Sequence, residues 1–173
     1  MHGRHSRRYH PRVATFTVET ILPAPLDRVW AFYEDVRDSL PLLSPPADQV
    51  HIEPFTGGTR EGLVLVIRAR GPLGRVVRWV ARYVEVVPPH AVVFGAEARF
   101  VDVQDEGPFK RWRHSHEFEA LDDRTTRQVD RIEYAVGWGP VGWLADVVVV
   151  RPKLRAMFAY RRQQLLKRFS ATC

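Results

Sequence analysis

The chain has 173 residues, 45% of them hydrophobic, which supplies one sizeable core but hardly two. Its lone cysteine, Cys173, excludes an intramolecular disulfide framework and a cysteine-based zinc site, and it favours a reducing, cytoplasmic setting. No apolar run has the length of a signal peptide or of a membrane-spanning helix, so the sequence predicts a soluble protein without a transmembrane segment.

Positive charge is concentrated near the two ends of the chain. The formal net charge is +6, and the leading residues Arg4, Arg7, Arg8 and Arg12 are all basic. Residues 1–12 have too little apolar surface to offset their ordering entropy, so we expect a basic, disordered tail before a single domain over residues 13–169. Further basic residues should decorate the solvated face of a last helix: Arg151, Lys153, Arg155, Arg161, Arg162, Lys167 and Arg168.

The predicted elements begin with a strand and two short helical segments. Ala14–Leu22 is rich in β-branched residues and stops at Pro23, which is typical of a strand. Helical spacing then predicts a helix from Leu26 to about Asp35. A broken helical segment follows around residues 37–43 and ends at Pro45 and Pro46.

Six further strand candidates follow, separated by turns rich in glycine, proline and aspartate. They are Val50–Phe55, Leu63–Arg70, Arg75–Val87, Ala91–Val103, Phe109–Leu121 and Thr125–Val136. Short turns imply antiparallel neighbours. Apolar and aromatic residues alternate with basic ones, so one face of the sheet should be buried and the other partly solvated.

The last segment, Val141–Phe169, has the pattern of a long helix. Its apolar stripe consists of Leu144, Val147 or Val148, Leu154, Phe158, Leu165 and Phe169. Val147–Val150 alone would suit a strand, but its place inside the longer pattern favours a helix, which Pro152 should kink or restart. Together the elements predict an α+β helix-grip fold: a curved seven-stranded antiparallel sheet wrapped around the C-terminal helix, with two short helices after the first strand.

The strand candidate at residues 109–121 carries the most informative pattern. A period of two places Trp112, His114, His116 and Phe118 on one buried face, where a sheet packed only for stability would carry aliphatic residues. Histidine among aromatics indicates a partly polar cavity wall. The following hairpin should bring Asp130 beside His116, where the carboxylate could fix the imidazole tautomer. An internally satisfied polar network is the structural alternative.

Metal and cofactor motifs are weak in this sequence. Alternate histidines can bind zinc, but zinc needs further ligands, and the rest of the body offers only His51 and His90 as additional histidines. Asp130 would complete a set of two histidines and one carboxylate, yet we expect no metal and no cofactor. The glycines at 57–58 and 71–74 are interpreted as turn residues because neither group opens a helix after a strand.

One region resembles a known family. The run from Asp102 to Phe118, followed by Thr126, Asp130, Tyr134 and residues 139–142, is similar to bacterial cyclase/dehydrase-like ligand-binding proteins of the SRPBCC (START/polyketide cyclase-like) superfamily. Residues 24–30 also resemble the start of that superfamily's first helix, and the resemblance covers about residues 13–169. It implies a helix-grip domain around an internal cavity. The superfamily includes lipid carriers, hormone receptors, quinone-pathway helpers and polyketide cyclases, so the chemistry stays open.

Three functional interpretations follow. The first is a binding protein for a small hydrophobic molecule, lipid-like or aromatic and polyketide-like, held between the sheet and the last helix. The lining would be Trp79, Tyr83, Trp112, His114, His116, Phe118, Tyr134, Leu154 and Phe158, although aromatics also fill ordinary cores. The cavity opening is expected near residues 71–74 or 138–140.

The second interpretation is an aromatase/cyclase-type enzyme. His114 or His116 would be the proton shuttle, and Asp130 or Tyr134 would orient it. The third is an interaction module for ribosome or RNA, supported by the basic tail and the basic last helix.

Overall fold

The computed structural model describes residues 13–71, 74–90, 94–137 and 139–170. The elements in chain order are β1 (Ala14–Leu22), α1 (Leu26–Glu34), α2 (Val36–Leu42), η1 (Pro46–Asp48), β2 (His51–Ile52), β3 (Val64–Arg70), β4 (Val76–Val87), β5 (Glu97–Glu106), β6 (Arg111–Ala120), β7 (Thr126–Ala135), α3 (Gly139–Ala145), η3 (Asp146–Val150) and α4 (Arg151–Ser170). The predicted tail over residues 1–12, together with residues 72–73 and 138 of the predicted openings, lies outside the described residues.

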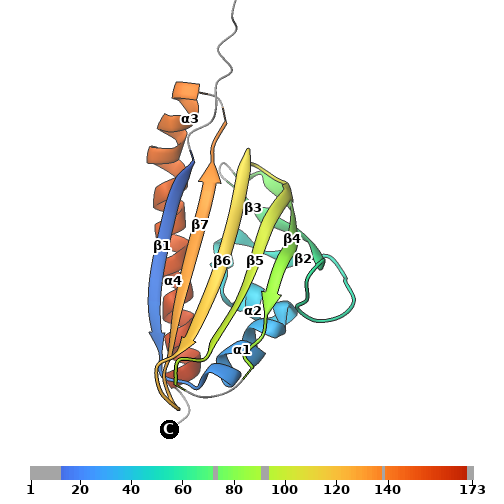
Figure 1. The fold of residues 1–173 in the computed structure, drawn as a ribbon. Helices are drawn as coiled ribbons and strands as arrows, with labels where there is room; N and C mark the ends of the chain where they lie inside the picture. The colour runs from blue at the N-terminus through green and yellow to red at the C-terminus, as the bar shows by residue number, and fades with distance from the viewer. Residues whose placement is uncertain (1–12, 72–73, 91–93, 138, 171–173) are drawn as a thin grey trace, which may run out of the picture.

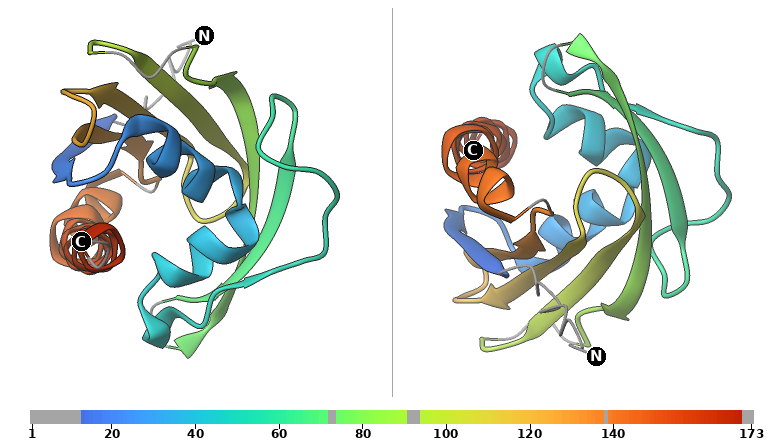
Figure 2. Two further views of the ribbon diagram at one scale, coloured as in Figure 1. Left: turned by 90° about the horizontal axis from the view of Figure 1, so that it is seen from below. Right: turned by 90° about the horizontal axis from the view of Figure 1, so that it is seen from above.

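All seven strands belong to one antiparallel sheet. Their order is β1-β7-β6-β5-β4-β3-β2, so the chain's first strand closes one edge beside its last (Figure 1). The register between β4 and β5 shifts twice, between Val80 and Ala81 and between Tyr83 and Glu85. Such irregularities bend a sheet and increase its twist. The end-on views of Figure 2 show the resulting curve, which surrounds α1 and α2.

The long helix α4 runs along β1 and β7, as Figures 1 and 2 both show. Leu154 and Phe158 pack into one core cluster with side chains of β6 and β7, and Leu165 and Phe169 pack into a second with residues of α1. The sheet therefore buries its concave face against α1 at one end and α4 along one side. The helix-grip prediction is confirmed.

The segment Val147–Val150 is helical rather than extended. It forms the π-helical turn η3, in which the Arg151 N–H donates to the Asp146 carbonyl, five residues back. Pro152 follows at once and has no N–H with which to bond Val148 in the preceding turn. A local widening of the helix is a common response to such an interruption.

The first part of the predicted helical stripe does not reach the core. Leu144 and Val148 are 55% and 61% exposed, and Figure 1 shows α3 beyond the first residues of β1. From Leu154 onward the stripe is buried as predicted. The helical periodicity was therefore right, but the sheet is too short to cover the whole helix.

The strands after β1 are all shorter than the sequence predicts, and the starts or ends of β2 and β5 have clear local causes. β2 consists only of His51–Ile52, because Pro54 cannot donate a backbone hydrogen bond to a neighbour. β5 starts at Glu97, after Gly95 turns the chain with a φ of 78°. Residues 91–93 of the predicted strand lie outside the described residues. Across the described part of the chain, no helix combines the length and apolar character needed to span a membrane.

Candidate functional site

A cluster of charged and polar side chains is buried on the concave face of the sheet. His114 and His116 come from β6, Asp130 from β7, Asp102 from β5 and Arg161 from α4. The exposed fractions of His114, His116, Asp130 and Arg161 are 6%, 6%, 3% and 7%. Neighbouring strands bring them to one level: His116 pairs with Asp130 and His114 with Asp102 in the strand registers. The period of two puts all four β residues on the same face.

Asp130 holds both histidines through one oxygen. Its Oδ1 lies 3.0 Å from His114 Nε2, which forms a hydrogen bond. The same oxygen lies 2.8 Å from His116 Nδ1, although this nitrogen is not aligned for a hydrogen bond. His116 and Asp130 are thus close together, as predicted, and His114 lies equally close to Asp130.

Further groups fix the orientation of Asp130. Its Oδ2 accepts a hydrogen bond from Gln128 Nε2 at 2.8 Å, and Gln128 also bonds the hydroxyl of Tyr33. On the helix side, Arg161 Nη1 lies 4.0 Å from Asp130 Oδ1, while the guanidinium covers the ring of Phe158. The carboxylate therefore has a fixed position between the sheet and α4.

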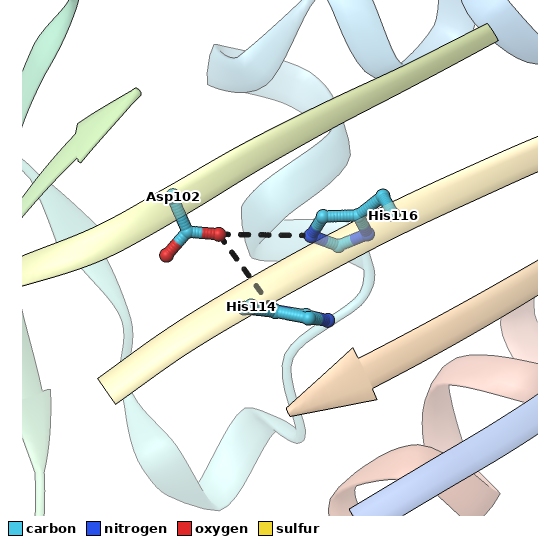
Figure 3. A group of neighbouring side chains, drawn as sticks. All are labelled: Asp102, His114 and His116. Carbon is cyan, nitrogen blue, oxygen red and sulfur yellow. Dashed lines mark ion pairs between the residues drawn. The ribbon is translucent and has the colours of Figure 1, made fainter. Parts of the chain in front are cut away.

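Asp102 faces the opposite nitrogens of the two imidazoles (Figure 3). Its Oδ2 lies 3.7 Å from His114 Nδ1 and 3.8 Å from His116 Nε2. The sequence analysis did not include Asp102 among the candidate site residues. The signal that could have found it is the alternation of Phe100, Asp102 and Gln104, because an antiparallel neighbour of β6 must share its buried face at every second residue.

Burial controls the electrostatics of the cluster. Desolvation lowers the pKa of both imidazoles, and for His114 the charge of His116 acts in the same direction. Burial also raises the pKa of Asp102. For Asp130 the desolvation that would raise the pKa is outweighed by the two histidines, which hold it below its usual range. Burial therefore favours the neutral form of each imidazole, and the hydrogen bond from His114 favours the ionised form of Asp130.

Aromatic rings enclose the two imidazoles. Phe100 stacks on His116 with ring centroids 4.1 Å apart, and the ring of His114 lies 3.8 Å from that of His116. Phe158 of α4 contacts His114 edge-on at 5.8 Å. The pair therefore lies inside the packed interior rather than on an open wall.

The predicted lining residues divide between two apolar clusters. Trp112, Tyr134, Leu154 and Phe158 belong to one of them. Tyr83 and Phe118 belong to the other, and Trp79 packs against both.

Tyr134 is engaged away from the histidines. Its hydroxyl donates to Asp146 Oδ1 at 2.6 Å, and burial together with this bond raises the pKa of Tyr134 to about 12. Of the two residues predicted to orient a histidine, Asp130 has the required geometry, whereas the Tyr134 hydroxyl is bonded elsewhere.

Two surface pockets lie apart from this cluster. One, of about 390 Å³, is lined by Glu61, Gly62, Arg82, Tyr83 and Val84. The other, of about 430 Å³, lies between α2 and β2 and is lined by Arg37, Pro41 and residues 50–55. Neither is bordered by His114 or His116. The internal cavity beside the histidines thus stays a prediction.

Residues 22–157 match the family model described as "Polyketide cyclase / dehydrase and lipid transport". The chain belongs to this family. The resemblance inferred from the sequence is therefore confirmed. No curated protein matches the chain at the sequence level.

Several solved structures share the fold. The Zhui aromatase/cyclase of Streptomyces sp. R1128 is 17% identical, with a TM-score of 0.57 over 88% of this chain and 94% of that one. A norcoclaurine synthase mutant of Thalictrum flavum, solved with a transition-state analogue, is 15% identical, with a TM-score of 0.63 over 93% of this chain and 99% of that one. Protein Ms6760 of Mycobacterium smegmatis is 18% identical, with a TM-score of 0.62 over 92% of each chain. At these identities the likeness concerns the fold.

Proposed function

We propose that this chain binds a small hydrophobic molecule, lipid-like or aromatic and polyketide-like, whose polar group meets His114 and His116. The observation that carries the proposal is a pair of buried imidazoles within 3.0 Å of Asp130 Oδ1, one packed against Phe100 and the other against Phe158. A sheet that needed only stability would gain more from aliphatic residues there, because burying polar groups costs free energy unless each is paired. Membership of the polyketide cyclase/dehydrase and lipid transport family supports a small-molecule ligand.

The tautomers determine which polar group fits. His114 Nε2 bonds Asp130, and an N–H on His116 Nδ1 avoids an acceptor contact with the same oxygen, so the nitrogens that face Asp102 are acceptors. Acceptors favour a ligand hydroxyl, whether phenol, enol or alcohol, over a bare carbonyl. The surrounding aromatic rings would contact the apolar body of that ligand.

Binding also requires the interior to open. Phe100 and Phe158 cover the two imidazoles, so a ligand must displace one of these rings or separate α4 from the sheet. This proposal therefore includes an opening between α4 and the concave face. The lone cysteine and the soluble fold support a cytoplasmic location, which we propose together with a single domain over residues 13–169.

Native mass spectrometry of the purified full chain, followed by denaturing extraction, tests the proposal. We expect a co-purifying hydrophobic molecule or saturable quenching of tryptophan fluorescence by added polycyclic phenols. The ring centroids of Trp79 and Trp112 are 4.9 Å apart within the predicted lining, so Trp79→Phe should reduce the quenching. Trp143→Phe, at a 59% exposed position, is the matched control. The binding proposal would be contradicted if no molecule co-purified with the chain and no added polycyclic phenol quenched its fluorescence.

An aromatase/cyclase-type enzyme is the second candidate. The observation that favours it is the contact of both histidines with Asp130, the arrangement expected of a general base and its orienting carboxylate. The test is conversion of a poly-β-ketone thioester to a cyclised product above the spontaneous rate. His116→Gln should lower that rate by about 10²- to 10⁴-fold if the imidazole moves a proton. Binding without turnover would support the binding proposal and contradict the aromatase/cyclase proposal.

A further inference from the structure

Three possible metal-ligand atoms converge at one point of the buried cluster. Asp102 Oδ2, His114 Nδ1 and His116 Nε2 lie within 4.8 Å of one another (Figure 3). They come from adjacent positions on β5 and β6, so the strand registers fix their approach. The sequence analysis considered a metal set built on Asp130, but the structure places Asp102 on the side where the free nitrogens meet.

The proton positions of the two imidazoles follow from Asp130. His114 Nε2 forms a hydrogen bond with Asp130 Oδ1, and because a carboxylate only accepts, this nitrogen carries the N–H of its ring. His116 Nδ1 lies 2.8 Å from the same oxygen without hydrogen-bond alignment, and an N–H on this nitrogen avoids a contact between two acceptors. A neutral imidazole has only one N–H. The two nitrogens that face Asp102 therefore present lone pairs to a carboxylate oxygen.

Arg161 acts on Asp102 only beyond ion-pair distance, because its guanidinium lies nearer to Asp130. The buried guanidinium of Arg161 lies beside Asp130, with Nη1 4.0 Å from Oδ1. Within the described ranges, no lysine or arginine forms an ion pair with Asp102, whose carboxylate approaches the two histidines and has a side-chain hydrogen bond with Trp112. Distances of 3.7 and 3.8 Å are too long for a direct hydrogen bond. A metal ion or a proton between these three acceptor atoms would relieve their mutual repulsion.

We propose that the chain binds a divalent transition-metal ion through His114 Nδ1, His116 Nε2 and Asp102 Oδ2. Two imidazoles and one carboxylate form a ligand set that suits Zn²⁺ and other first-row ions and leaves a coordination position open. Bonds of about 2.0–2.1 Å in a tetrahedral site would bring the ligand atoms to roughly 3.4 Å from one another, against 3.7 and 3.8 Å from Asp102 Oδ2 to the two nitrogens here.

Asp130 would be the positioning residue of this site. Metal-binding histidines usually donate their other N–H to a carboxylate, which fixes ring orientation and raises ligand basicity. Asp130 Oδ1 stands in that position for both rings at once. The open coordination position would then be available to a ligand oxygen, which the ion would polarise as a Lewis acid. Metal binding is measured without any organic ligand, so it succeeds or fails independently of the proposed function.

The test is Zn²⁺ binding by the metal-stripped full chain, measured by isothermal titration and by metal analysis after dialysis. The leading segment contains His2, His5 and His10, which could bind zinc by themselves, so these three are first changed to alanine. We expect one Zn²⁺ per chain in this background. Asp102→Asn, which keeps the size of the side chain, should weaken binding at least tenfold, and Asp130→Asn should weaken it about 10- to 100-fold.

His51→Gln is the matched control because this exposed histidine on β2 is not part of the convergence. It should leave zinc affinity unchanged. Folding of every variant is checked by near-ultraviolet circular dichroism. X-ray absorption at the zinc edge identifies the ligand atoms in the chain that lacks only the tail histidines, so this measurement does not depend on whether a cluster variant folds. Two imidazoles and a carboxylate around zinc would support the site. Loss of all binding with the three tail histidines, or equal affinity in Asp102→Asn and His51→Gln, would overturn it.

Discussion

Tyr134 donates its hydroxyl proton to Asp146 Oδ1 at 2.6 Å, which ties the end of β7 to the π-helical turn before α4. Arg151 donates to the other oxygen of the same carboxylate at 2.9 Å. Asp146 is 6% exposed, so its two oxygens depend on these partners. The bond between Tyr134 and Asp146 therefore helps set where the long helix begins against the sheet.

Tyr134→Phe should lower the free energy of unfolding by about 1–3 kcal/mol, because a buried carboxylate oxygen loses its donor while the ring still packs. Urea denaturation measures this change. Tyr160→Phe on α4 is the control and should alter stability by less than about 0.5 kcal/mol, since this side chain is only partly buried. Equal effects of the two variants would show that the bond contributes nothing.

Acid should destabilise the folded chain through the histidine pair. Both imidazoles have a pKa below the ordinary value of 6.5, so below that pH the unfolded state binds more protons than the folded state. Stability contributed by the neutral forms is present above pH 6.5 and is lost as pH falls below it. The loss should reach up to about 1.4 kcal/mol per pH unit for each histidine.

Urea denaturation between pH 7 and pH 5 checks this dependence. The double variant His114→Gln/His116→Gln should flatten the slope, whereas His51→Gln, at an exposed position, should retain it. The titration of Asp130 does not contribute to the stability change between pH 7 and pH 5. Its pKa is held below the usual range, so its contribution is lost only at still lower pH. An unchanged slope in the double variant would assign the acid sensitivity to other groups.

Sequence periodicity predicted part of the site and missed part of it. The period of two in β6 and the hairpin to β7 were sufficient to place His114, His116 and Asp130 together. Arg161 was expected on a solvated face because basic residues usually decorate helices, yet it is buried against Asp130. Arg161 lies at helical spacing on the buried stripe with Leu154, Phe158 and Leu165. This spacing indicated that Arg161 is buried, although an arginine is usually exposed.

Other contacts could not be predicted because they depend on local irregularities. Tyr134 was placed correctly on the concave face, but its partner Asp146 lies in a π-helical turn that helical periodicity does not anticipate. The packing of Phe100 on His116 requires the register between β5 and β6, which the turn residues alone do not specify. Fold and strand faces thus followed from the pattern, whereas side-chain partners followed from three-dimensional register.

Deleting residues 1–12 should leave the melting temperature nearly unchanged. The segment is polar and basic. The first strand starts after it, where Ala14 of β1 pairs with Tyr134 of β7. Differential scanning calorimetry of the full and shortened chains measures the difference. A large decrease would mean that the segment contributes to the folded domain.

Asp130→Asn should be among the most destabilising single changes in this chain. The substitution removes the negative charge that faces Arg161 and leaves a guanidinium that is 7% exposed without its counter-ion. Breaking a buried pair by removing one partner costs about 3–5 kcal/mol. Asp122→Asn removes a carboxylate that bonds Arg124 and Thr125 within an exposed turn, and it should cost less than about 1 kcal/mol.

A double-mutant cycle isolates the interaction between Asp130 and Arg161. Arg161→Met removes the buried charge but keeps an unbranched side chain beside Phe158, so Asp130→Asn/Arg161→Met should recover part of the stability lost in Asp130→Asn alone. Ligand retention is measured in the same variants. It should decrease more in Asp130→Asn than in Asp122→Asn, because only Asp130 fixes the imidazoles. If both variants fold and retain ligand equally, His116 and Asp130 are ordinary core residues and the proposed site is wrong.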